Sequence, residues 1–96
     1  MVTIWSNVAK HQLNTAFQFI KKDSLQNAIK VRDEIIETTI TLPLKPEIYP
    51  LDKYKTNNDG SYRAFEMHRY RVSYRLLPDI IRIVRLRHTS ISPLSY

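Results

Sequence analysis

Hydrophobic positions in the first forty residues change from a short apolar run to a helical period. The run Val2 to Trp5 is rich in β-branched and aromatic residues and predicts a strand. Apolar side chains then recur every three or four residues, which predicts one face of a helix: Ala9, Leu13, Ala16, Phe17 and Ile20. Asp23-Ser24 interrupts this pattern, and a second helical set follows: Leu25, Ala28, Ile29, Arg32, Ile35, Ile36 and Thr39 or Ile40. So short a break predicts an antiparallel helical hairpin.

An irregular stretch follows the second helix and lasts to about Ser61. Prolines end the helix and interrupt the segment after it: Pro43, Pro46 and Pro50. Asn57-Asn58-Asp59-Gly60 is the strongest turn signal in the chain. Apolar residues within the stretch predict that it is held against the body of the protein: Leu44, Ile48, Tyr49, Leu51 and Tyr54. Loops of this length in small domains are often functional.

From Tyr62 the hydrophobic period changes to two, which predicts strands. Three strands of a meander are expected, at Tyr62–Met67, Arg69–Leu76 and Ile80–Arg87, with tight links between them. On the middle strand the tyrosines and Val72 point one way, and Arg71, Ser73 and Arg75 point the other. We therefore expect a sheet with helices on its apolar side and an open, arginine-lined opposite face.

These elements predict a single α+β domain over residues 1–96. An N-terminal strand and an α-helical hairpin would pack on a mostly antiparallel sheet that ends in the three-stranded meander. The first strand is expected to join the edge of this sheet or to pair within it. The length of 96 residues suits one domain and leaves no room for a second.

Composition removes several classes of function. The absence of cysteine excludes a disulfide framework, a thiolate zinc site and a cysteine nucleophile. The single glycine excludes the phosphate-binding loop and the dinucleotide fingerprint, so no cofactor is expected. No pair of histidines has metal-binding spacing, so no metal is expected either. No segment resembles a membrane span or a signal peptide, which predicts a cytoplasmic protein without membrane contact.

Charge is concentrated in the last third of a chain whose net charge is +6. Residues 62–96 hold seven arginines and no lysine, against only Glu66 and Asp79. Guanidinium groups grip phosphate or carboxylate with paired hydrogen bonds, so this segment suggests an anionic partner. A solvated sheet face is the plain alternative. Charge alone would also permit a nucleic-acid-binding domain, although no exposed aromatic motif of the RNA-recognition kind accompanies it.

Two segments of the meander resemble a known family. Tyr70-Arg71-Val72-Ser73-Tyr74 is similar to the Tyr-Arg-Leu/Val-x-Tyr strand of the RelE/ParE superfamily of bacterial toxins. The segment from Ile83 to Ser90, with Pro93 shortly after, resembles that superfamily's last strand and the histidine-containing segment that closes it. The helix pattern followed by Leu42-Pro43 is similar to the ParE side of the superfamily. In order and spacing, these resemblances cover nearly the whole chain.

The resemblance implies the toxin of a type II toxin–antitoxin system, held inactive by a cognate antitoxin. ParE-like members poison DNA gyrase, whereas RelE-like members cut ribosome-bound mRNA with the 2′-hydroxyl as nucleophile. The helix pattern favours the ParE-like mechanism, as does Phe65, which stands where RelE-like toxins have a second lysine. The ribosome-dependent endoribonuclease is the alternative, so enzymatic activity stays open. The resemblance also allows a higher-order toxin–antitoxin complex.

Site residues carried over from the superfamily depend on the mechanism. If the protein is a nuclease, Arg71 occupies the position of the family's catalytic strand arginine, Arg63 lies near a lysine position, and His88 closes the last strand. Arg75, Arg85 and Arg87 are candidate binding residues. Arg71 and Arg75 could instead flank an antitoxin groove, and His88 could be structural. The arginines of the last strand could simply charge a sheet edge against pairing.

Overall fold

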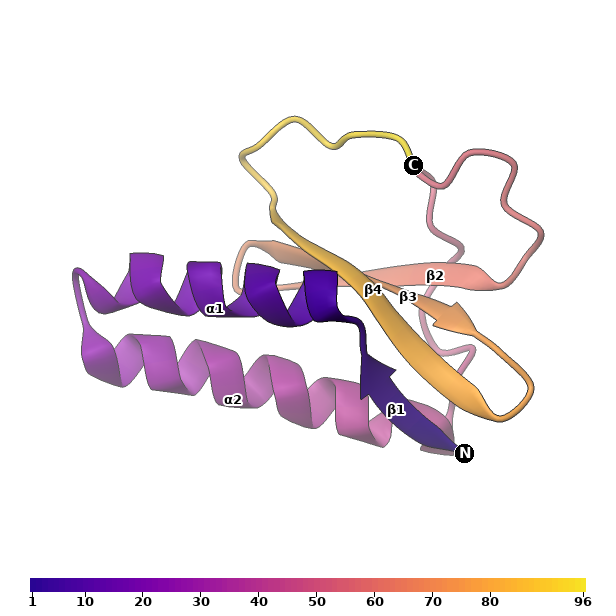
Figure 1. Ribbon diagram of the computed structural model, residues 1–96, viewed down its shortest axis with the longest axis horizontal. Coiled ribbons are helices and arrows are strands. Elements are labelled where there is room, and N and C mark those ends of the chain that lie inside the picture. The colour runs from indigo at the N-terminus through magenta and orange to yellow at the C-terminus, as the bar shows by residue number, and fades with distance from the viewer.

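Two helices lie on one side of a four-stranded sheet in the computed structural model, which describes residues 1–96 (Figure 1). The helices are α1 (Asn7–Lys21) and α2 (Leu25–Thr41), followed by a short 3₁₀ helix, η1 (Leu42–Leu44). The strands are β1 (Val2–Trp5), β2 (Tyr62–Met67), β3 (Tyr70–Leu76) and β4 (Ile80–His88). The predicted α+β class, helical hairpin and meander are confirmed, with boundaries shifted by at most one or two residues.

The sheet order is β1-β4-β3-β2, so the first strand lies at an edge, as expected. β1 pairs with β4 in parallel, and the other neighbours are antiparallel. β4 is therefore an interior strand over its first half, which holds Arg82, whereas Arg85 and Arg87 lie in its second half, beyond the pairing with β1. The alternative that these arginines charge a sheet edge is wrong for Arg82 and stays a prediction for Arg85 and Arg87. They project from the face of the sheet that is turned away from the helices.

Serine caps and a tight turn define the helical hairpin. The Ser6 side chain accepts a hydrogen bond from the Ala9 N–H at 3.1 Å, and Ser24 accepts one from the Asn27 N–H at 3.0 Å. Each cap satisfies an amide that the first helical turn leaves free. The cap at Ser24, only a few residues after the end of α1, starts the antiparallel return that the sequence predicted.

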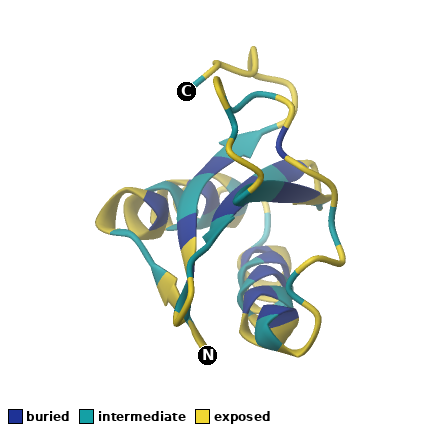
Figure 2. Ribbon diagram, turned by 90° about the vertical axis from the view of Figure 1, so that its right-hand side faces the viewer, coloured by how far each residue is buried: buried dark blue, intermediate teal, exposed yellow.

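The inner face of the sheet, which the helices cover, holds the apolar core. Figure 2 shows the buried residues gathered where the helices meet the strands. The core residues come from every helix and strand except β1, whose Trp5 packs against the cluster: Ala9, Ala16, Val31, Ile35, Leu42, Phe65, Tyr70, Val72, Tyr74, Ile81, Ile83 and Leu86. Tyr74 is fully buried, and its hydroxyl donates to the Pro46 carbonyl at 2.9 Å, so the one polar atom of this side chain is satisfied.

A β-bulge at Val84 keeps apolar residues on the inner face along the whole of β4. Ser73 pairs with Arg85, whereas the next residue, Tyr74, pairs with Ile83, so Val84 is an extra residue in the strand. Ile81 and Ile83 precede the bulge and Leu86 follows it, and all three are buried. Without the bulge, strict alternation would turn Leu86 outward and its arginine neighbours inward.

The outer face of the sheet is covered, contrary to the open face that the sequence predicted. The loop of residues 45–61 docks on β2, where the Asp52 N–H donates to the Tyr62 carbonyl at 2.9 Å and the Ala64 N–H donates to the Pro50 carbonyl at 3.2 Å. The C-terminal tail, residues 89–96, arches over the sheet to end beside this loop (Figure 1). Of the apolar residues expected to hold the loop, Tyr49 stacks on Phe65 and Tyr54 on Arg71, whereas Leu44, Ile48 and Leu51 are exposed. No helix combines the length and the apolar character needed to cross a membrane.

Candidate functional site: the arginine layer

Between the outer face of the sheet and its cover lies a layer of charged and aromatic side chains, here called the arginine layer. Its members are Asp52, Tyr54, Arg71, Arg75, Arg85, Arg87 and Tyr96. The strand register brings the arginines together, because Arg71 is directly opposite Arg87 across the β3–β4 ladder. Arg85 is opposite Ser73, one position further along the same face. The register and the alternation of side chains together place the three guanidinium groups of Arg71, Arg85 and Arg87 side by side.

Arg71 is the most heavily engaged of these arginines. Its Nη2 donates to Asp52 Oδ1 at 2.9 Å and its Nη1 donates to Glu66 Oε2 at 3.1 Å. The guanidinium also stacks on Tyr54, 4.8 Å from the ring centre. Only 13% of the side chain is exposed. Burial alone would lower the pKa of Arg71, but the two carboxylates outweigh it and raise that pKa. The expected solvent-facing arginine is thus an internal ion-pair partner.

Asp52 is the centre of the arginine layer, with 0% of its side chain exposed. Besides Arg71, it accepts hydrogen bonds from the Tyr96 hydroxyl at 2.6 Å and from the Tyr54 N–H at 3.1 Å. Burial would raise the pKa of Asp52, but the bonds from Tyr96 and Arg71 overcome that effect and hold the pKa below its usual value. Asp52 is therefore a buried carboxylate that stays charged near neutral pH.

Tyr96 fixes the tail to this centre from the other side. Its carbonyl accepts from the Thr56 N–H at 2.7 Å, and its N–H donates to the Tyr54 carbonyl at 3.1 Å. Burial and the bond to the Asp52 carboxylate raise the pKa of the Tyr96 hydroxyl. The phenol therefore stays protonated and serves as a donor. The tail and the loop of residues 45–61 are tied to each other as well as to the sheet.

Arg85 and Arg87 have no carboxylate partner within ion-pair distance. The Arg85 guanidinium lies 4.0 Å from the centre of the Tyr96 ring, and Arg87 Nη2 donates to the Ser92 carbonyl at 3.0 Å. Burial lowers the pKa of Arg85, and the neighbouring charges of Arg87 and Arg71 act in the same direction. A small hollow of about 50 Å³ under the tail is lined by these three arginines and by His88.

His88 closes β4 beside this hollow. Its Nδ1 accepts hydrogen bonds from the Ser90 N–H at 3.0 Å and from the Ser90 hydroxyl at 2.6 Å. Its ring meets Tyr70 edge-on, with 5.0 Å between the ring centres. Because Nδ1 is an acceptor, the neutral ring carries its proton on Nε2. These contacts are those of a strand-ending residue that also orders the first turn of the tail.

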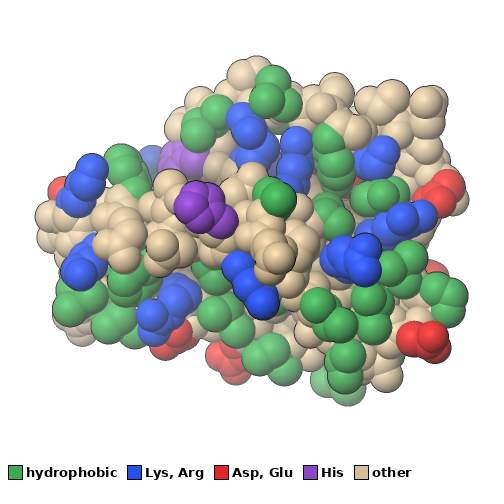
Figure 3. Space-filling model, viewed as in Figure 1, with side chains coloured by type: hydrophobic (Ala, Val, Ile, Leu, Met, Phe, Trp, Pro, Cys, Tyr) green, Lys and Arg blue, Asp and Glu red, His purple; other side chains and the backbone are tan.

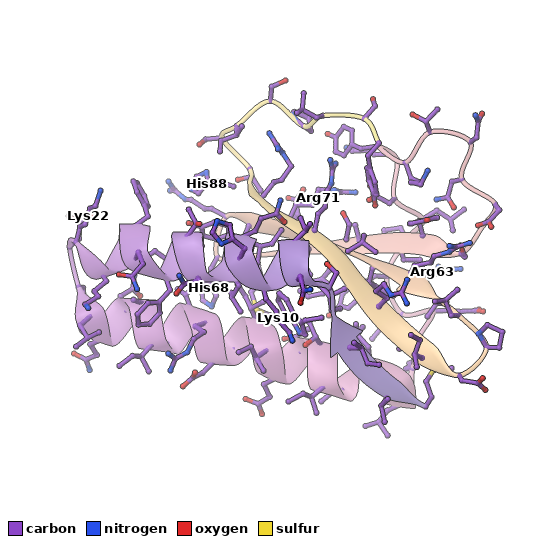
Figure 4. All side chains as sticks on the ribbon, viewed as in Figure 1. Lys10, Lys22, Arg63, His68, Arg71 and His88 are labelled. Carbon is purple, nitrogen blue, oxygen red and sulfur yellow. The ribbon has the colours of Figure 1, made fainter.

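Arg63 lies apart from the other candidate nuclease residues. It pairs across the β2–β3 ladder with Tyr74, so it belongs to the inner face, whereas Arg71 belongs to the outer face. Its Nη1 donates to the Tyr49 carbonyl at 2.7 Å. In Figure 4, Arg71 lies near the middle of the view, with His88 to its left and Arg63 to its right. The structure brings Arg71, Arg85, Arg87 and His88 together and leaves Arg63 out.

Arg75 is also separated from the hollow, at the end of β3 that lies near the turn before β2. Its Nε donates to the Ser61 hydroxyl at 3.1 Å, and its guanidinium stacks on Tyr62, 4.9 Å from the ring centre. An ion pair with Asp59, at 3.5 Å, completes its contacts. Arg75 therefore stabilises the loop end and is not part of the same cation cluster.

Asp52, Tyr54 and Tyr96 are the members of this layer that the sequence-based interpretation did not identify as site residues. The signal available for Asp52 was weak, because the segment around it mixes apolar residues with several charged ones, among them Glu47. Tyr96 carried no comparable signal, because its position depends on the path of the tail. No group of three or more histidine, aspartate or glutamate side chains is placed to hold a metal ion.

Apolar side chains also reach the surface over the helices and β1. Figure 3 shows hydrophobic side chains gathered over this part of the molecule. The large exposed ones there are Val2, Ile4, Val8, Phe19, Leu25, Ile29 and Ile40. A groove of about 590 Å³ runs between β1 and the two helices and is lined in part by Ile4, Phe17 and Ile36. So much apolar surface on a small domain is typical of a protein that binds other proteins.

Comparison with known proteins gives a family and a similar structure. Residues 3–93 match the model of the family described as the ParE toxin of the type II toxin–antitoxin system parDE. A chain from the chromosomal ParDE toxin–antitoxin system of P. aeruginosa has a similar structure, with a TM-score of 0.71. The match covers 92% of this chain and 95% of that chain, at 15% sequence identity, and it shows a shared fold. No curated protein sequence is detectably similar to this one.

Proposed function

The chain belongs to the ParE toxin family of type II toxin–antitoxin systems, and from this membership we propose that it inhibits growth by binding DNA gyrase. In this proposal it acts in the cytoplasm through protein contacts, without catalysing a reaction. A cognate antitoxin neutralises it. The proposal combines the family with the character of the surface, on which apolar side chains stand among positive charges and the main candidate catalytic arginine is already engaged.

The engagement of Arg71 is the observation that carries this proposal. A ribonuclease of the RelE type needs cationic groups free to hold a phosphate and a donor and acceptor for protons. Arg71 instead gives its Nη atoms to Asp52 and Glu66. The His88 Nδ1 is occupied by Ser90, and Arg63 is on the opposite face of the sheet. Neutralising Arg71 with two carboxylates suits a structural role better than a role in offsetting transition-state charge.

One observation favours the alternative, ribosome-dependent cleavage of mRNA. Arg85, Arg87 and His88 line a single hollow, and neither arginine has a carboxylate partner. This group could hold a phosphate if the tail moved aside. Arg71 would not join this group, because its partner Asp52 belongs to the loop and not to the tail, so we keep cleavage as the second candidate.

Two parallel assays with the purified protein test the proposal. We expect inhibition of gyrase-catalysed DNA supercoiling and no new mRNA ends in a reconstituted translation reaction. Arg85→Gln separates the candidates, because a nuclease built on the hollow would lose cleavage with this change. New ribosome-dependent mRNA ends, together with unaffected supercoiling, would overturn the gyrase proposal in favour of the nuclease.

The antitoxin is expected to be encoded by a short reading frame next to this one. An acidic, amphipathic segment would suit a domain with net charge +6 and exposed apolar side chains. Co-expression with that neighbour should give a complex that survives purification and that suppresses the growth defect. Toxicity that persists undiminished on co-expression, with no complex recovered, would remove the partner from the proposal.

A further inference from the structure

The second half of β4 has a free backbone edge. β1 pairs with β4 only from Ile80 to Ile83, and Ser6 adds two bonds, from its N–H to the Ile83 carbonyl and from its hydroxyl to the Val84 carbonyl at 3.4 Å. Beyond that point β1 has turned into α1, while β4 continues to His88. On its other side β4 remains paired with β3 to its end. Residues 85–88 therefore have a neighbouring strand on one side only.

The backbone groups of Leu86 and His88 are the ones that face this free edge. In an antiparallel ladder, alternate residues turn their N–H and C=O groups toward the partner strand and away from it. The Leu86 N–H donates to the side chain of Gln12, at 2.7 Å from Oε1, so Leu86 faces away from β3. His88, two residues later, has the same orientation. The Leu86 carbonyl and the His88 N–H have no backbone partner across that edge.

The Gln12 side chain takes the place of a missing strand. Its amide oxygen reaches from α1 to a peptide N–H that a neighbouring strand would otherwise bind. Sheets bind extended peptides by this kind of backbone pairing, which gives affinity without a particular sequence. A peptide carbonyl could replace the Gln12 oxygen on Leu86 and at the same time satisfy the groups that follow it.

A groove lies along this edge and is large enough for a short peptide. Its volume is about 460 Å³, and it runs between α1 and the end of β4. Its apolar lining comes from Ala16, Phe19, Tyr70, Leu86 and Ile91. Phe19 is 61% exposed and Ile91 is also exposed, so two large apolar side chains stand at its rim. Alternate side chains of an added strand would point into this lining.

The charge of the groove identifies the kind of peptide that would bind there. Arg87 and His88 line it, and no aspartate or glutamate does. The Nε atom of Arg87 is buried and has no hydrogen-bond acceptor. A carboxylate next to the bound strand would supply that acceptor and offset the positive charge. The matching partner is therefore an extended segment in which apolar residues alternate with acidic ones.

We propose that an extended, acidic and apolar segment of the antitoxin adds to the sheet as a short strand along residues 85–88 of β4, in the groove beside α1. This rests on the proposed function only in its choice of partner. Main-chain bonds to Leu86 and His88 would set the register, Phe19 and Ile91 would cover the apolar side chains, and Arg87 would bind a carboxylate.

Hydrogen exchange of single amides tests the pairing directly. In the free protein the His88 amide should exchange quickly, whereas the Arg85 and Arg87 amides, which face β3, should be protected. In the complex co-expressed from the neighbouring reading frame, the His88 amide should slow by about a hundredfold or more, as expected for an amide that enters a ladder. An amide at His88 that exchanges equally fast in the free protein and in the complex would overturn the proposal.

Two substitutions at His88 separate the backbone from the side chain. His88→Pro removes the edge-facing N–H without removing a bond to β3, and should weaken the complex by about tenfold or more. His88→Ala loses the same imidazole but keeps the N–H, so it should bind about tenfold or more tightly than His88→Pro. Thermal unfolding of both variants shows whether they fold. Equal binding by folded His88→Pro and His88→Ala would contradict strand addition.

The groove wall is tested by Phe19→Asp, with Val8→Asp as its matched control. Both positions are on α1 and both side chains are 61% exposed, but only Phe19 lines the groove. Phe19→Asp should weaken the complex by about tenfold or more, and by clearly more than Val8→Asp, which does not alter the groove. Equal effects would place the contact elsewhere.

Failure of this proposal can be told apart from failure of the proposed function. One outcome is a stable complex in which the His88 amide exchanges as fast as in the free protein and Phe19→Asp binds as tightly as the wild type. That result would keep the antitoxin as the partner and reject only the added strand. If the wild type forms no complex at all, the partner assignment itself fails.

Discussion

Helices α1 and α2 cover the inner face of the sheet with aliphatic and aromatic side chains, whereas residues 45–61 and 89–96 cover the outer face with arginines, tyrosines and one aspartate. The inner layer is stabilised by removing apolar surface from water, which depends little on direction or on pH. The outer layer depends on a few directed bonds to Asp52, so it is more specific and easier to disrupt at one atom. The two faces of one sheet are thus covered by layers that different interactions stabilise: apolar burial on the inner face, and ion pairs and hydrogen bonds on the outer face.

The inner layer should show the larger effect of a single truncation. Ile83 is fully buried between the sheet and the helices, so Ile83→Ala leaves a cavity and should lower the free energy of unfolding by about 3–4 kcal/mol. The loss should be the same at pH 4 and pH 7. Denaturant unfolding measures it, with the exposed neighbour Arg82→Ala as the control expected to stay within about 0.5 kcal/mol. If the loss of stability on Ile83→Ala differed between pH 4 and pH 7, the inner layer would not be the pH-independent one of the two.

The outer layer should lose almost as much when its one buried carboxylate is neutralised. Asp52→Asn leaves Arg71 with Glu66 alone and should lower the free energy of unfolding by about 3 kcal/mol, the lower end for a broken buried pair, since Glu66 remains. Asp59→Asn is the control, because Asp59 is an exposed carboxylate that also pairs with an arginine. If the two variants are equally stable, the arginine layer contributes no more than a surface ion pair.

Low pH should weaken the contribution of the outer layer to stability and leave that of the inner layer unchanged. The folded-state pKa of Asp52 lies below its usual value of about 4, so its contribution to stability is complete above that value and is lost as the pH falls through the folded-state pKa. We expect the wild type to lose stability more steeply below pH 4 than Asp52→Asn does. Unfolding midpoints measured from pH 2 to pH 7 provide the test. Parallel curves for the two proteins would contradict it.

Removing the Tyr96 hydroxyl should lower the stability by less, and it tests how much this group contributes to holding the tail. Tyr96→Phe keeps the ring over Arg85 but removes the 2.6 Å bond to Asp52, so we expect a loss of about 1–2 kcal/mol. The backbone bonds between Tyr96 and residues 54–56 should keep the tail in place. Hydrogen exchange at Thr56 reports this. A fast-exchanging Thr56 amide in the variant would show that the hydroxyl alone holds the tail.

The smallest expected effect concerns a turn outside both layers and has the opposite sign. His68 and Arg69 link β2 and β3 with φ angles of +53° and +67°, in the left-handed region that favours glycine. Arg69→Gly should therefore raise the free energy of unfolding by about 0.5–1 kcal/mol. Thermal unfolding measures the gain, and Arg82→Gly, in an extended strand position, should destabilise the protein instead. A loss at Arg69 would mean that its side chain stabilises the hairpin.

The inner layer was largely predictable from the sequence, because a period of 3.6 or 2 records which side chains are buried. The predicted helical hairpin and strands correspond to the observed elements for this reason. The outer cover left no periodic signal, since residues 45–61 and 89–96 are irregular and their path depends on single bonds to Asp52 and Tyr96. Arg71 was therefore placed on the correct face but expected to be exposed. The separation of Arg63 from Arg71 follows from alternation once the register between β2 and β3 is known.

The bulge at Val84 has a consequence for how this strand can change in evolution. If Val84 were deleted, the remaining residues of β4 would alternate without a break, so every arginine and every isoleucine would keep its face. Loss of one residue is thus tolerable at this position, whereas an insertion or deletion near Ile81 would exchange core and surface. Such a deletion would still alter the local twist and redirect the end of the strand. Length variation among related chains at Val84 would leave the core intact and change the direction in which the last residues of β4 point.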